Sequence, residues 1–216
     1  MREIFDISLP LSSEMVIWPG SPGFHIEKIM SIEKGDPVNN SKMVCDVHSG
    51  THIDAPLHHI QGGDSVEKLS IQDMVGPSVV ADLSSVSQIT ATDLERLNLP
   101  EDTQKLLLRT HNSEYWKKDS KRFRTDYVGL SKDAAEWVVK QNIRLVGIDY
   151  LSVQMYFDSS ETHQILLNAG VIILEGLNLG QIKEGQYELI CLPLNIVGAE
   201  GSPARVVLRK LNGGFF

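Results

Sequence analysis

The stretch HSGTHIDAPLHH, residues 48–59, contains four of the chain's seven histidines together with one carboxylate. Imidazole and carboxylate groups suit zinc, manganese or iron, and the run lacks cysteine, the usual ligand of structural zinc sites. This density of ligands indicates a catalytic metal site, and a set of unrelated surface or core histidines is the alternative. The candidate ligands in the run are His48, His52 and Asp54.

The same stretch is not expected to be helical. Gly50 and Pro56 disfavour helical backbone, and the HExxH pattern of helical zinc sites is absent. In an extended chain His48, His52 and Asp54 share one face, but the Cα atoms of the two histidines would be roughly 13 Å apart at ~3.3 Å per residue. We therefore expect the chain to bend at Gly50, where glycine supplies the necessary backbone freedom.

The stretch ends in two adjacent histidines. His58 follows Asp54 by four residues, beyond the rigid Pro56, and can be held near a metal without ligating it. A histidine in that place can shuttle a proton during catalysis. His59 would point elsewhere in an extended chain, and we expect it to have a structural role or to lie behind the ligands.

Composition limits the classes of protein that the chain can represent. Its 216 residues are 42% hydrophobic, which is enough for one domain over residues 1–216 with a sizeable core. Cys45 and Cys191 lack CxxC spacing and fit reduced thiols in a cytoplasmic protein. The charged N-terminus does not resemble a signal peptide, and no apolar run approaches the ~18 residues of a membrane span.

The charge balance argues against a nucleic-acid partner. A net charge of -8 opposes binding to a phosphate backbone. The basic stretch 117–124 is interrupted by Asp119, and we interpret it as a solvated loop, with a polyanion site as the alternative. The sequence therefore predicts a small-molecule substrate and no nucleic acid or membrane partner.

Hydrophobic patterns predict an α/β protein, a single domain with a mixed sheet and few helices. Strands are expected at residues 3–9, 25–32, 43–48, 78–83, 105–110, 144–149, 171–175, 187–194 and 204–211. Helices are expected at 131–141, with Ser131 as the N-cap, at 159–168 and at 92–97. Turn-forming loops are expected at 18–23, 62–64 and 198–203.

Two further ligand candidates lie in the second half of the chain. His163 falls in the first turn of the helix expected at 159–168. Glu175 follows four apolar residues, and a carboxylate in that place is costly to bury without a cation or hydrogen-bond donors. Each alone is better explained as a solvated or paired side chain, but together with the first cluster they suggest a second group of ligands.

The motif at residues 48–58 resembles the HxGTHxDxPxH signature of the cyclase-like metal-dependent hydrolases, which include bacterial kynurenine formamidases. Further similarities cover nearly the whole chain: Asp6-Ile7-Ser8, Trp18-Pro19-Gly20, Leu108-Arg109-Thr110-His111, Gly147-Ile148-Asp149, His163 and Leu174-Glu175-Gly176-Leu177. The resemblance implies the swivelling β/β/α (cyclase-like) fold and a homodimer or higher homo-oligomer. We expect Arg109 and Asp149 to stabilise the fold or to support the metal ligands without binding the metal.

The resemblance also implies two divalent metal ions per subunit. His48, His52 and Asp54 would bind one ion, and Asp54 would bridge to a second ion completed by His163 and Glu175. Zinc is favoured by the likeness to kynurenine formamidases, although nitrogen and carboxylate ligands suit manganese equally.

For the reaction, the resemblance implies hydrolysis of an aryl formamide, N-formylkynurenine, to kynurenine and formate. A metal-activated hydroxide would attack the carbonyl, with His58 as the acid/base residue and Trp18 in the substrate pocket. Read without the resemblance, Trp18 is more typical of core or loop packing. Other aromatic residues that could stack on an aryl group are Phe24, Trp116, Tyr156 and Phe157.

Three other functions are compatible with the same residues. An isatin-type hydrolase would open a cyclic amide with the same water activation, and a cyclase or dehydratase would use the same metals and His58. A non-catalytic metal-binding protein would keep the ligands without needing His58 or an open coordination position.

Overall fold

The computed structural model describes residues 3–118, 121–159 and 161–211. The strands are β1 (Ile4–Asp6), β2 (Phe24–Met30), β3 (Asn40–Cys45), β4 (His52–Asp54), β5 (Val75–Asp82), β6 (Lys105–Arg109), β7 (Leu145–Ile148), β8 (Ile172–Glu175), β9 (Gly185–Pro193) and β10 (Gly201–Lys210). The α-helices are α1 (Ile71–Met74), α2 (Ala91–Glu95), α3 (Ser113–Lys118), α4 (Lys132–Lys140) and α5 (Glu161–Asn168).

Eight strands form one mixed sheet in the order β1-β10-β4-β8-β7-β6-β5-β9, and it closes on itself because β9 also pairs with β10. The strands β5, β6, β7 and β8 are parallel, and the segments that connect them contain α2 to α5. Parallel neighbours require such crossover connections, which here carry helices to the outside of the sheet. The strands β1, β4, β9 and β10 complete the sheet with antiparallel pairs.

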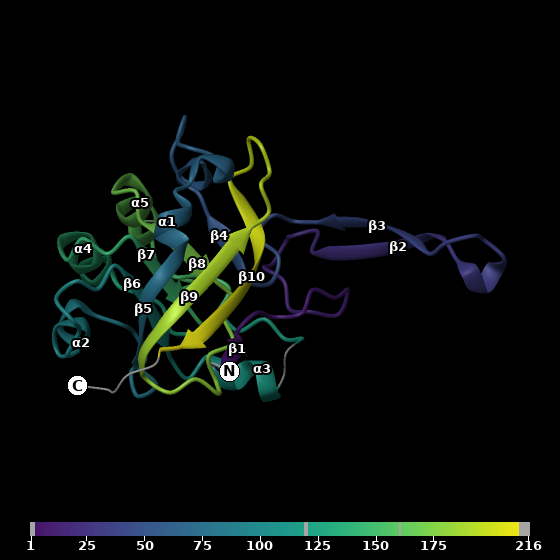
Figure 1. Cartoon of the computed structure of the whole chain (residues 1–216). Coiled ribbons are helices and arrows are strands. Elements are labelled where there is room, and N and C mark those ends of the chain that lie inside the picture. Colours follow the sequence, from purple (N-terminus) through teal and green to yellow (C-terminus); the bar gives the residue numbers. More distant parts are fainter. Residues whose placement is uncertain (1–2, 119–120, 160, 212–216) are drawn as a thin grey trace.

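Helices α2, α4 and α5 lie together on one side of the sheet (Figure 1). This layer explains the burial of the central strands on both faces. Along β6, Leu107 faces the core enclosed by the sheet, whereas Leu106 and Leu108 pack toward the helices. Strands covered on both faces read as continuous apolar runs, as β6 does.

The strands β2 and β3 form a separate two-stranded sheet. They pair antiparallel in a long hairpin that projects away from the rest of the molecule, with the 3-10 turn η1 (Ile32–Lys34) near its tip (Figure 1). The hairpin returns at Cys45, and the chain then turns toward the first histidine cluster.

The structure confirms the mixed α/β fold with few helices, and each of the nine predicted strands is present with shifted ends. The helix α4 begins after Ser131, whose side-chain oxygen accepts a hydrogen bond from the Ala134 N–H. The helix α5 matches the one predicted at 159–168, of which residue 160 lies outside the described residues.

Three local predictions need correction, and β4, α1 and α3 were not predicted. The strand predicted at 43–48 ends at Cys45, and the short strand β4 was not expected because three residues carry too little pattern. The helices α1 and α3 were also missed. The basic stretch 117–124 begins in the last turn of α3 rather than in a loop, and its residues 119–120 lie outside the described residues. The loop predicted at 198–203 ends before Gly201, because β10 begins at that residue, which pairs with Asp54.

Among the described residues, none of the helices has the length and apolar character needed to cross a membrane.

Candidate metal centre and active site

Strand register brings the two halves of the site together. The strand β4 lies between β10 and β8, and within its pair with β8 His52 stands directly opposite Glu175. Residues opposite each other in an antiparallel pair project to the same face. The Nε2 atom of His52 consequently lies 3.3 Å from Oε2 of Glu175, although 122 positions separate the two residues in the sequence.

A bend at Gly50 places His48 beside the same carboxylates. Gly50 has φ +65, in the left-handed region that favours glycine, and a Cβ there would lie 2.8 Å from the Leu11 side chain. The backbone N–H of His48 donates to the Asp46 carboxylate at 3.0 Å, which fixes the turn before the bend. The predicted bend is therefore confirmed, and His48 reaches the site from a turn rather than from a strand.

The Asp54 carboxylate lies at the centre of the cluster and is almost inaccessible to solvent. Its Oδ1 atom is 2.8 Å from Nδ1 of His48 and 3.5 Å from Nε2 of His52. Its Oδ2 atom is 3.8 Å from Nε2 of His163, too far for a hydrogen bond. Both carboxylate oxygens thus face imidazole nitrogens on different sides.

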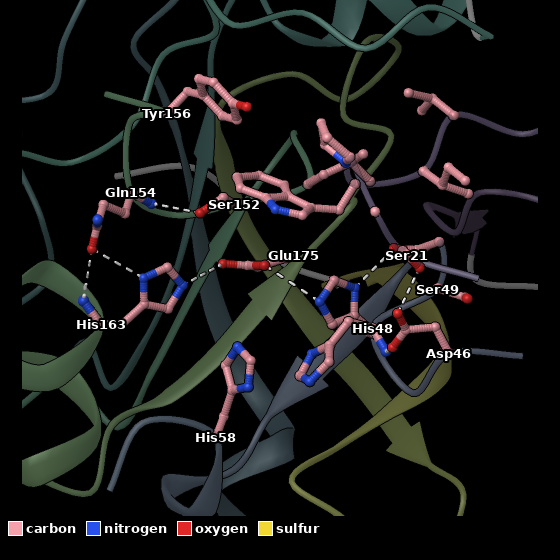
Figure 2. Close-up of a pocket in the computed structure, with 18 of the residues that line it drawn as sticks. Ser21, Asp46, His48, Ser49, His58, Ser152, Gln154, Tyr156, His163 and Glu175 are labelled. Carbon is pink, nitrogen blue, oxygen red and sulfur yellow. Dashed lines mark hydrogen bonds and ion pairs between the residues drawn. The ribbon is translucent and has the colours of Figure 1, made fainter. Parts of the chain in front are cut away.

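The Glu175 carboxylate makes a parallel set of contacts. Its Oε1 atom accepts a hydrogen bond from the Val153 N–H at 2.6 Å and lies 3.2 Å from Nε2 of His163. Figure 2 shows His163 joined to Glu175 by a dashed line, in the cavity that His48 and His58 also line. The carboxylate predicted from its place at the end of an apolar strand is thus buried among histidines, as the cost of burying it alone requires.

Backbone and amide oxygens orient the rings of two of these histidines. The Nδ1 atom of His52 lies 3.0 Å from the carbonyl oxygen of Gly50, and Nδ1 of His163 lies 3.2 Å from Oε1 of Gln154. Both partners are acceptors, so each Nδ1 carries a proton and each Nε2 faces the carboxylates, to which it donates when the ring is protonated. With a metal ion bound, the same Nε2 would offer its lone pair to the ion. This is the arrangement that orients histidine ligands in metal sites. Sequence analysis missed Gln154, which no local motif marks.

His58 and His59 stand at the edge of the cluster. The ring of His58, in the 3-10 turn η2 (Pro56–His58), lies 4.0 Å from the ring of His48 between centroids. The ring of His59 stacks on His163 with centroids 4.6 Å apart and planes at 20°. The contact of His59 is through its ring face, which agrees with the supporting role expected for it.

Charges inside the cluster shift the ionisation of its members. Burial alone would raise the pKa of Asp54, but the hydrogen bond from His48 and the neighbouring imidazoles hold it well below its usual range. Burial opposes protonation of His52, yet Glu175 and Asp54 outweigh it and raise its pKa to about 9. Burial lowers the pKa of His58, which keeps that imidazole neutral at pH 7.

The described side chains contain two overlapping groups whose ligand atoms lie close enough to hold an ion. One group is His48, Asp54 and His58, and the other is His52, Asp54 and Glu175. Asp54 belongs to both, as a bridging carboxylate would. These groups differ from those implied by the resemblance in placing His58 beside His48 and in leaving out His163. The Nε2 atom of His163 nevertheless lies 3.2 Å from Oε1 of Glu175 and 3.8 Å from Oδ2 of Asp54.

The cluster opens into a cavity of about 530 Å³ whose lining includes Trp18 and Tyr156. Trp18 is 39% exposed and packs against Phe123 and Tyr156 with ring centroids 5.1 and 5.5 Å apart. The other aromatic candidates are placed differently. Trp116 stacks on Tyr150 in the interior, and Phe24 and Phe157 are not among the residues that line this cavity.

The polar residues Arg109 and Asp149 lie outside the cavity lining. Asp149 is buried and accepts four hydrogen bonds from the backbone and hydroxyl groups of Thr110 and Ser113. Arg109 pairs with Asp82. Both residues therefore support the ends of strands, as expected.

The fold and site together describe a mixed α/β protein with a buried histidine and carboxylate cluster beneath an aromatic cavity. The family model described as "Putative cyclase" matches residues 5–155. The chain belongs to this cyclase family.

Sequence and structure comparisons show which known proteins this chain is similar to. It is 39% identical over 210 residues to the kynurenine formamidase of Bacillus cereus (strain ATCC 10987 / NRS 248), covering 97% of this chain and 98% of that protein. It superimposes on a structure described as a potential metal-dependent hydrolase with cyclase activity with a TM-score of 0.85 and 34% identity, over 99% and 100% of the two chains. Isatin hydrolase A from Labrenzia aggregata, solved with benzyl benzoate, matches with a TM-score of 0.79 and 25% identity, over 96% and 93% of the two chains.

Proposed function

We propose that this protein is an arylformamidase that hydrolyses N-formylkynurenine to kynurenine and formate. Its class, a hydrolase acting on amide C–N bonds, follows from the match to kynurenine formamidase over nearly the full length of both proteins. The observation that carries the proposal is the central position of Asp54, both of whose oxygens face histidines on different sides of the cluster.

The donor set of the cluster fits divalent metal ions. Two buried polar atoms, Oδ2 of Asp54 and Nε2 of His48, have no hydrogen-bond partner in the described part of the chain. Buried polar atoms are rarely left unpaired, and nitrogen with carboxylate oxygen suits zinc and manganese. We propose two ions per chain, zinc by preference, held by His48, His52, Asp54, His163 and Glu175. Such ions lower the pKa of a water molecule toward neutrality and polarise a carbonyl group.

His58 is the proposed acid/base residue. Its lowered pKa keeps an imidazole nitrogen free to accept a proton at neutral pH. It stands beside His48 at the cavity and can therefore take the proton of the attacking water and return it to the nitrogen of the leaving amine. In formamide hydrolysis this return neutralises the aniline nitrogen as its bond to the formyl carbon breaks.

The aromatic residues of the cavity supply the proposed recognition of the aryl ring. A volume of about 530 Å³ lies in the range of small-molecule sites and admits one aryl substrate. Trp18 lines the cavity and is 39% exposed, although it packs against Tyr156 and Phe123. We propose that Trp18 and Tyr156 hold the aniline ring while the formyl group reaches the metal ligands.

A cyclic amide is the second candidate substrate. The likeness to isatin hydrolase A extends over almost the whole chain, and opening of isatin needs the same attack on an amide carbonyl. The two substrates differ in the leaving group, which departs as a separate amine from the formamide but stays attached in the cyclic amide.

A direct comparison of the two substrates tests the proposal. Protein stripped of metal with a chelator and reloaded with zinc or manganese is assayed for kynurenine release and for isatin opening. We expect kcat/KM for N-formylkynurenine to exceed that for isatin by at least 100-fold. A preference for isatin would replace the proposed substrate but keep the hydrolase class, and no turnover of either would leave the cyclase chemistry to be tested.

We also propose a cytoplasmic location. The structure contains Cys45 and Cys191 as free thiols, as expected from their spacing, and free thiols persist in a reducing compartment. Both cysteines in protein purified from the native host should consequently react with a thiol reagent once the protein is unfolded in urea, without prior reduction.

A further inference from the structure

The charged groups of the cavity are carboxylates and histidines. Among the described residues that line it, five are histidines and two are carboxylates, and none is a lysine or an arginine. Lysine and arginine are the side chains that bind a ligand carboxylate with a permanent charge. N-formylkynurenine ends in an amino-acid group, which carries both an ammonium and a carboxylate at neutral pH. The described lining can therefore offer a permanent countercharge to the ammonium group but not to the carboxylate.

The two carboxylates of the lining differ in their contacts. The oxygens of Glu175 face His52, His163 and the Val153 N–H, so this side chain is occupied within the cluster. Asp46 is only partly buried and lies outside both groups that could hold a metal ion. It also forms no ion pair in the described part of the chain. Asp46 is consequently the carboxylate that a ligand in the cavity can reach.

Two hydrogen bonds hold the Asp46 carboxylate in place. Its Oδ1 atom accepts from the His48 backbone N–H at 3.0 Å, and its Oδ2 atom accepts from the Ser21 hydroxyl at 2.6 Å. An ionised carboxylate offers about four acceptor sites, so each oxygen of Asp46 can accept a further hydrogen bond. The side chain is thus a fixed anionic acceptor in the wall of the cavity.

The hydrogen bond between Ser21 and Asp46 joins this carboxylate to the loop that carries Trp18. The Ser21 N–H donates to the Trp18 carbonyl oxygen at 3.0 Å, and the Asp46 N–H donates to the carbonyl oxygen of Gly23 at 3.0 Å. Figure 2 shows Asp46 and Ser21 on one side of the cavity and His163 on the other. An aryl ring held by Trp18 would share a wall with Asp46, and the substituent of that ring is the part of the substrate left to reach the carboxylate.

We propose that Asp46 binds the ammonium group of the substrate, so that the cavity selects aryl amides whose ring substituent ends in an amine. A hydrogen bond between an ammonium and a carboxylate is charge-assisted and stronger than one between neutral groups. The substrate carboxylate meets no lysine or arginine among the described lining residues and adds nothing to binding. This inference rests on the proposed function for the aryl amide itself, but the preference for an amine can be measured by binding as well as by turnover.

Calorimetric titration of the zinc-loaded protein with three product-like probes tests the proposal. The probes are aminophenyl ketones with the same ring and chain length. One chain ends in an ammonium group, the second ends in a methyl group, and the third is kynurenine, which carries the ammonium and the carboxylate together. We expect the dissociation constant of the ammonium probe to be lower than that of the methyl probe by about 10-fold or more. Kynurenine should bind no more tightly than the ammonium probe.

Matched substitutions assign this preference to Asp46. The amide of Asp46→Asn can still accept from the His48 N–H and can donate to the Ser21 hydroxyl, so the variant loses the charge and keeps the shape. Asp102→Asn is the control, because Asp102 is exposed and is not among the residues that line the cavity. The advantage of the ammonium probe should disappear in Asp46→Asn and persist in Asp102→Asn. Ser21→Ala, which removes one of the two anchors of the carboxylate, should reduce the advantage and supplies a second variant if Asp46→Asn fails to fold.

Several results would overturn the proposal. Equal dissociation constants for the ammonium and methyl probes would do so, as would no measurable binding of any probe or an ammonium advantage that survives in folded Asp46→Asn. Tighter binding of kynurenine than of the ammonium probe would show that the carboxylate is recognised after all.

The formamides of the same three compounds separate this inference from the proposed function. If none of them is hydrolysed but the ammonium probe keeps its advantage in binding, the formamidase activity is refuted and the role of Asp46 stands. If they are hydrolysed with equal kcat/KM for the ammonium and methyl compounds, the role of Asp46 is refuted and the formamidase activity stands.

Discussion

Substitution of Gly176 probes the contact that joins the two halves of the site. Gly176 follows Glu175, and its carbonyl oxygen accepts a hydrogen bond of 2.5 Å from Thr51 Oγ1. A Cβ at Gly176 would lie 2.1 Å from the carbonyl oxygen of Gly50 and 3.1 Å from the backbone nitrogen of Thr51. Gly176→Ala must therefore separate the segment that carries His52 from the strand that carries Glu175.

The expected cost has two parts. Gly176 has φ +68, and an L-residue in the left-handed region costs about 1–2 kcal/mol. Overpacking of a close contact adds typically 1–3 kcal/mol, which gives about 2–5 kcal/mol for Gly176→Ala. Gly170→Ala is a matched control because Gly170 has φ +72 but open space around its Cβ position. It should lose only the backbone part, about 1–2 kcal/mol.

Urea unfolding of the two variants, together with their metal content and kcat, measures these effects. Relief of the overlap needs a shift of about 1 Å, and displacements of that size can cost on the order of 10²-fold in rate. We expect Gly176→Ala to be less stable than Gly170→Ala and to lose turnover, while Gly170→Ala keeps its metal and kcat. Equal stability losses with unchanged turnover in both variants would refute the idea that this contact sets the site geometry.

Three further predictions follow from the cluster. His58→Ala should retain bound metal but lose ~10²–10⁴-fold in kcat, whereas Asp54→Ala should lose both the bound metal and turnover. Metal analysis and steady-state kinetics measure these effects, and an unchanged kcat in His58→Ala would show that His58 is not the acid/base residue. Gln154→Leu should weaken metal affinity 10–100-fold by releasing Nδ1 of His163, and an unchanged dissociation constant in a chelator competition assay would contradict this. Because the folded-state pKa of His52 is raised to about 9 from 6.5, its stabilisation of the metal-stripped protein is complete below pH 6.5 and is lost as pH rises through about 9. Urea unfolding at pH 6.5 and 9.5 should show this decrease, and the opposite trend would show that the carboxylates do not stabilise the protonated form of His52.

Much of the cluster is predictable from local chemistry. Gly50 interrupts an extended run between two histidines that a flat strand would hold too far apart, so a bend is required if both serve one site. Glu175 ends an apolar strand, where a carboxylate needs partners of opposite charge or hydrogen-bond donors. In both cases the residue is unfavourable in an ordinary strand, which marks it as a candidate site residue. Gly50 and Glu175 both line the same cavity.

Other features depend on long-range pairing and leave little local signal. The strand β4 is only three residues long, and it exists because β10 and β8 pair with it on both sides. Gln154 reaches His163 from the loop after β7, and nothing in its neighbourhood predicts that contact. Gly201 was predicted to lie in a loop, but it is the first residue of β10. A Cβ at Gly201 would lie 2.7 Å from the His48 ring, so this end of β10 packs closely against that ring.

In the hairpin of β2 and β3, the local sequence pattern predicts the strands but not the exposure of their side chains. Its strands were predicted from alternation and β-branched residues, which are satisfied in a hairpin as well as in a buried sheet. Exposure of Ile26 and Met43 could not be predicted, because the same apolar pattern normally marks a face turned to the core.

The measurement that tests the central claim most directly is a titration of metal-stripped protein with zinc, in which bound ions per chain and kynurenine release from N-formylkynurenine are followed together. The account predicts turnover that rises to its maximum as occupancy reaches two ions per chain, and no zinc-dependent turnover in Asp54→Ala. Full occupancy of the unmodified protein without kynurenine release, or equal turnover before and after the metal is stripped, would contradict it.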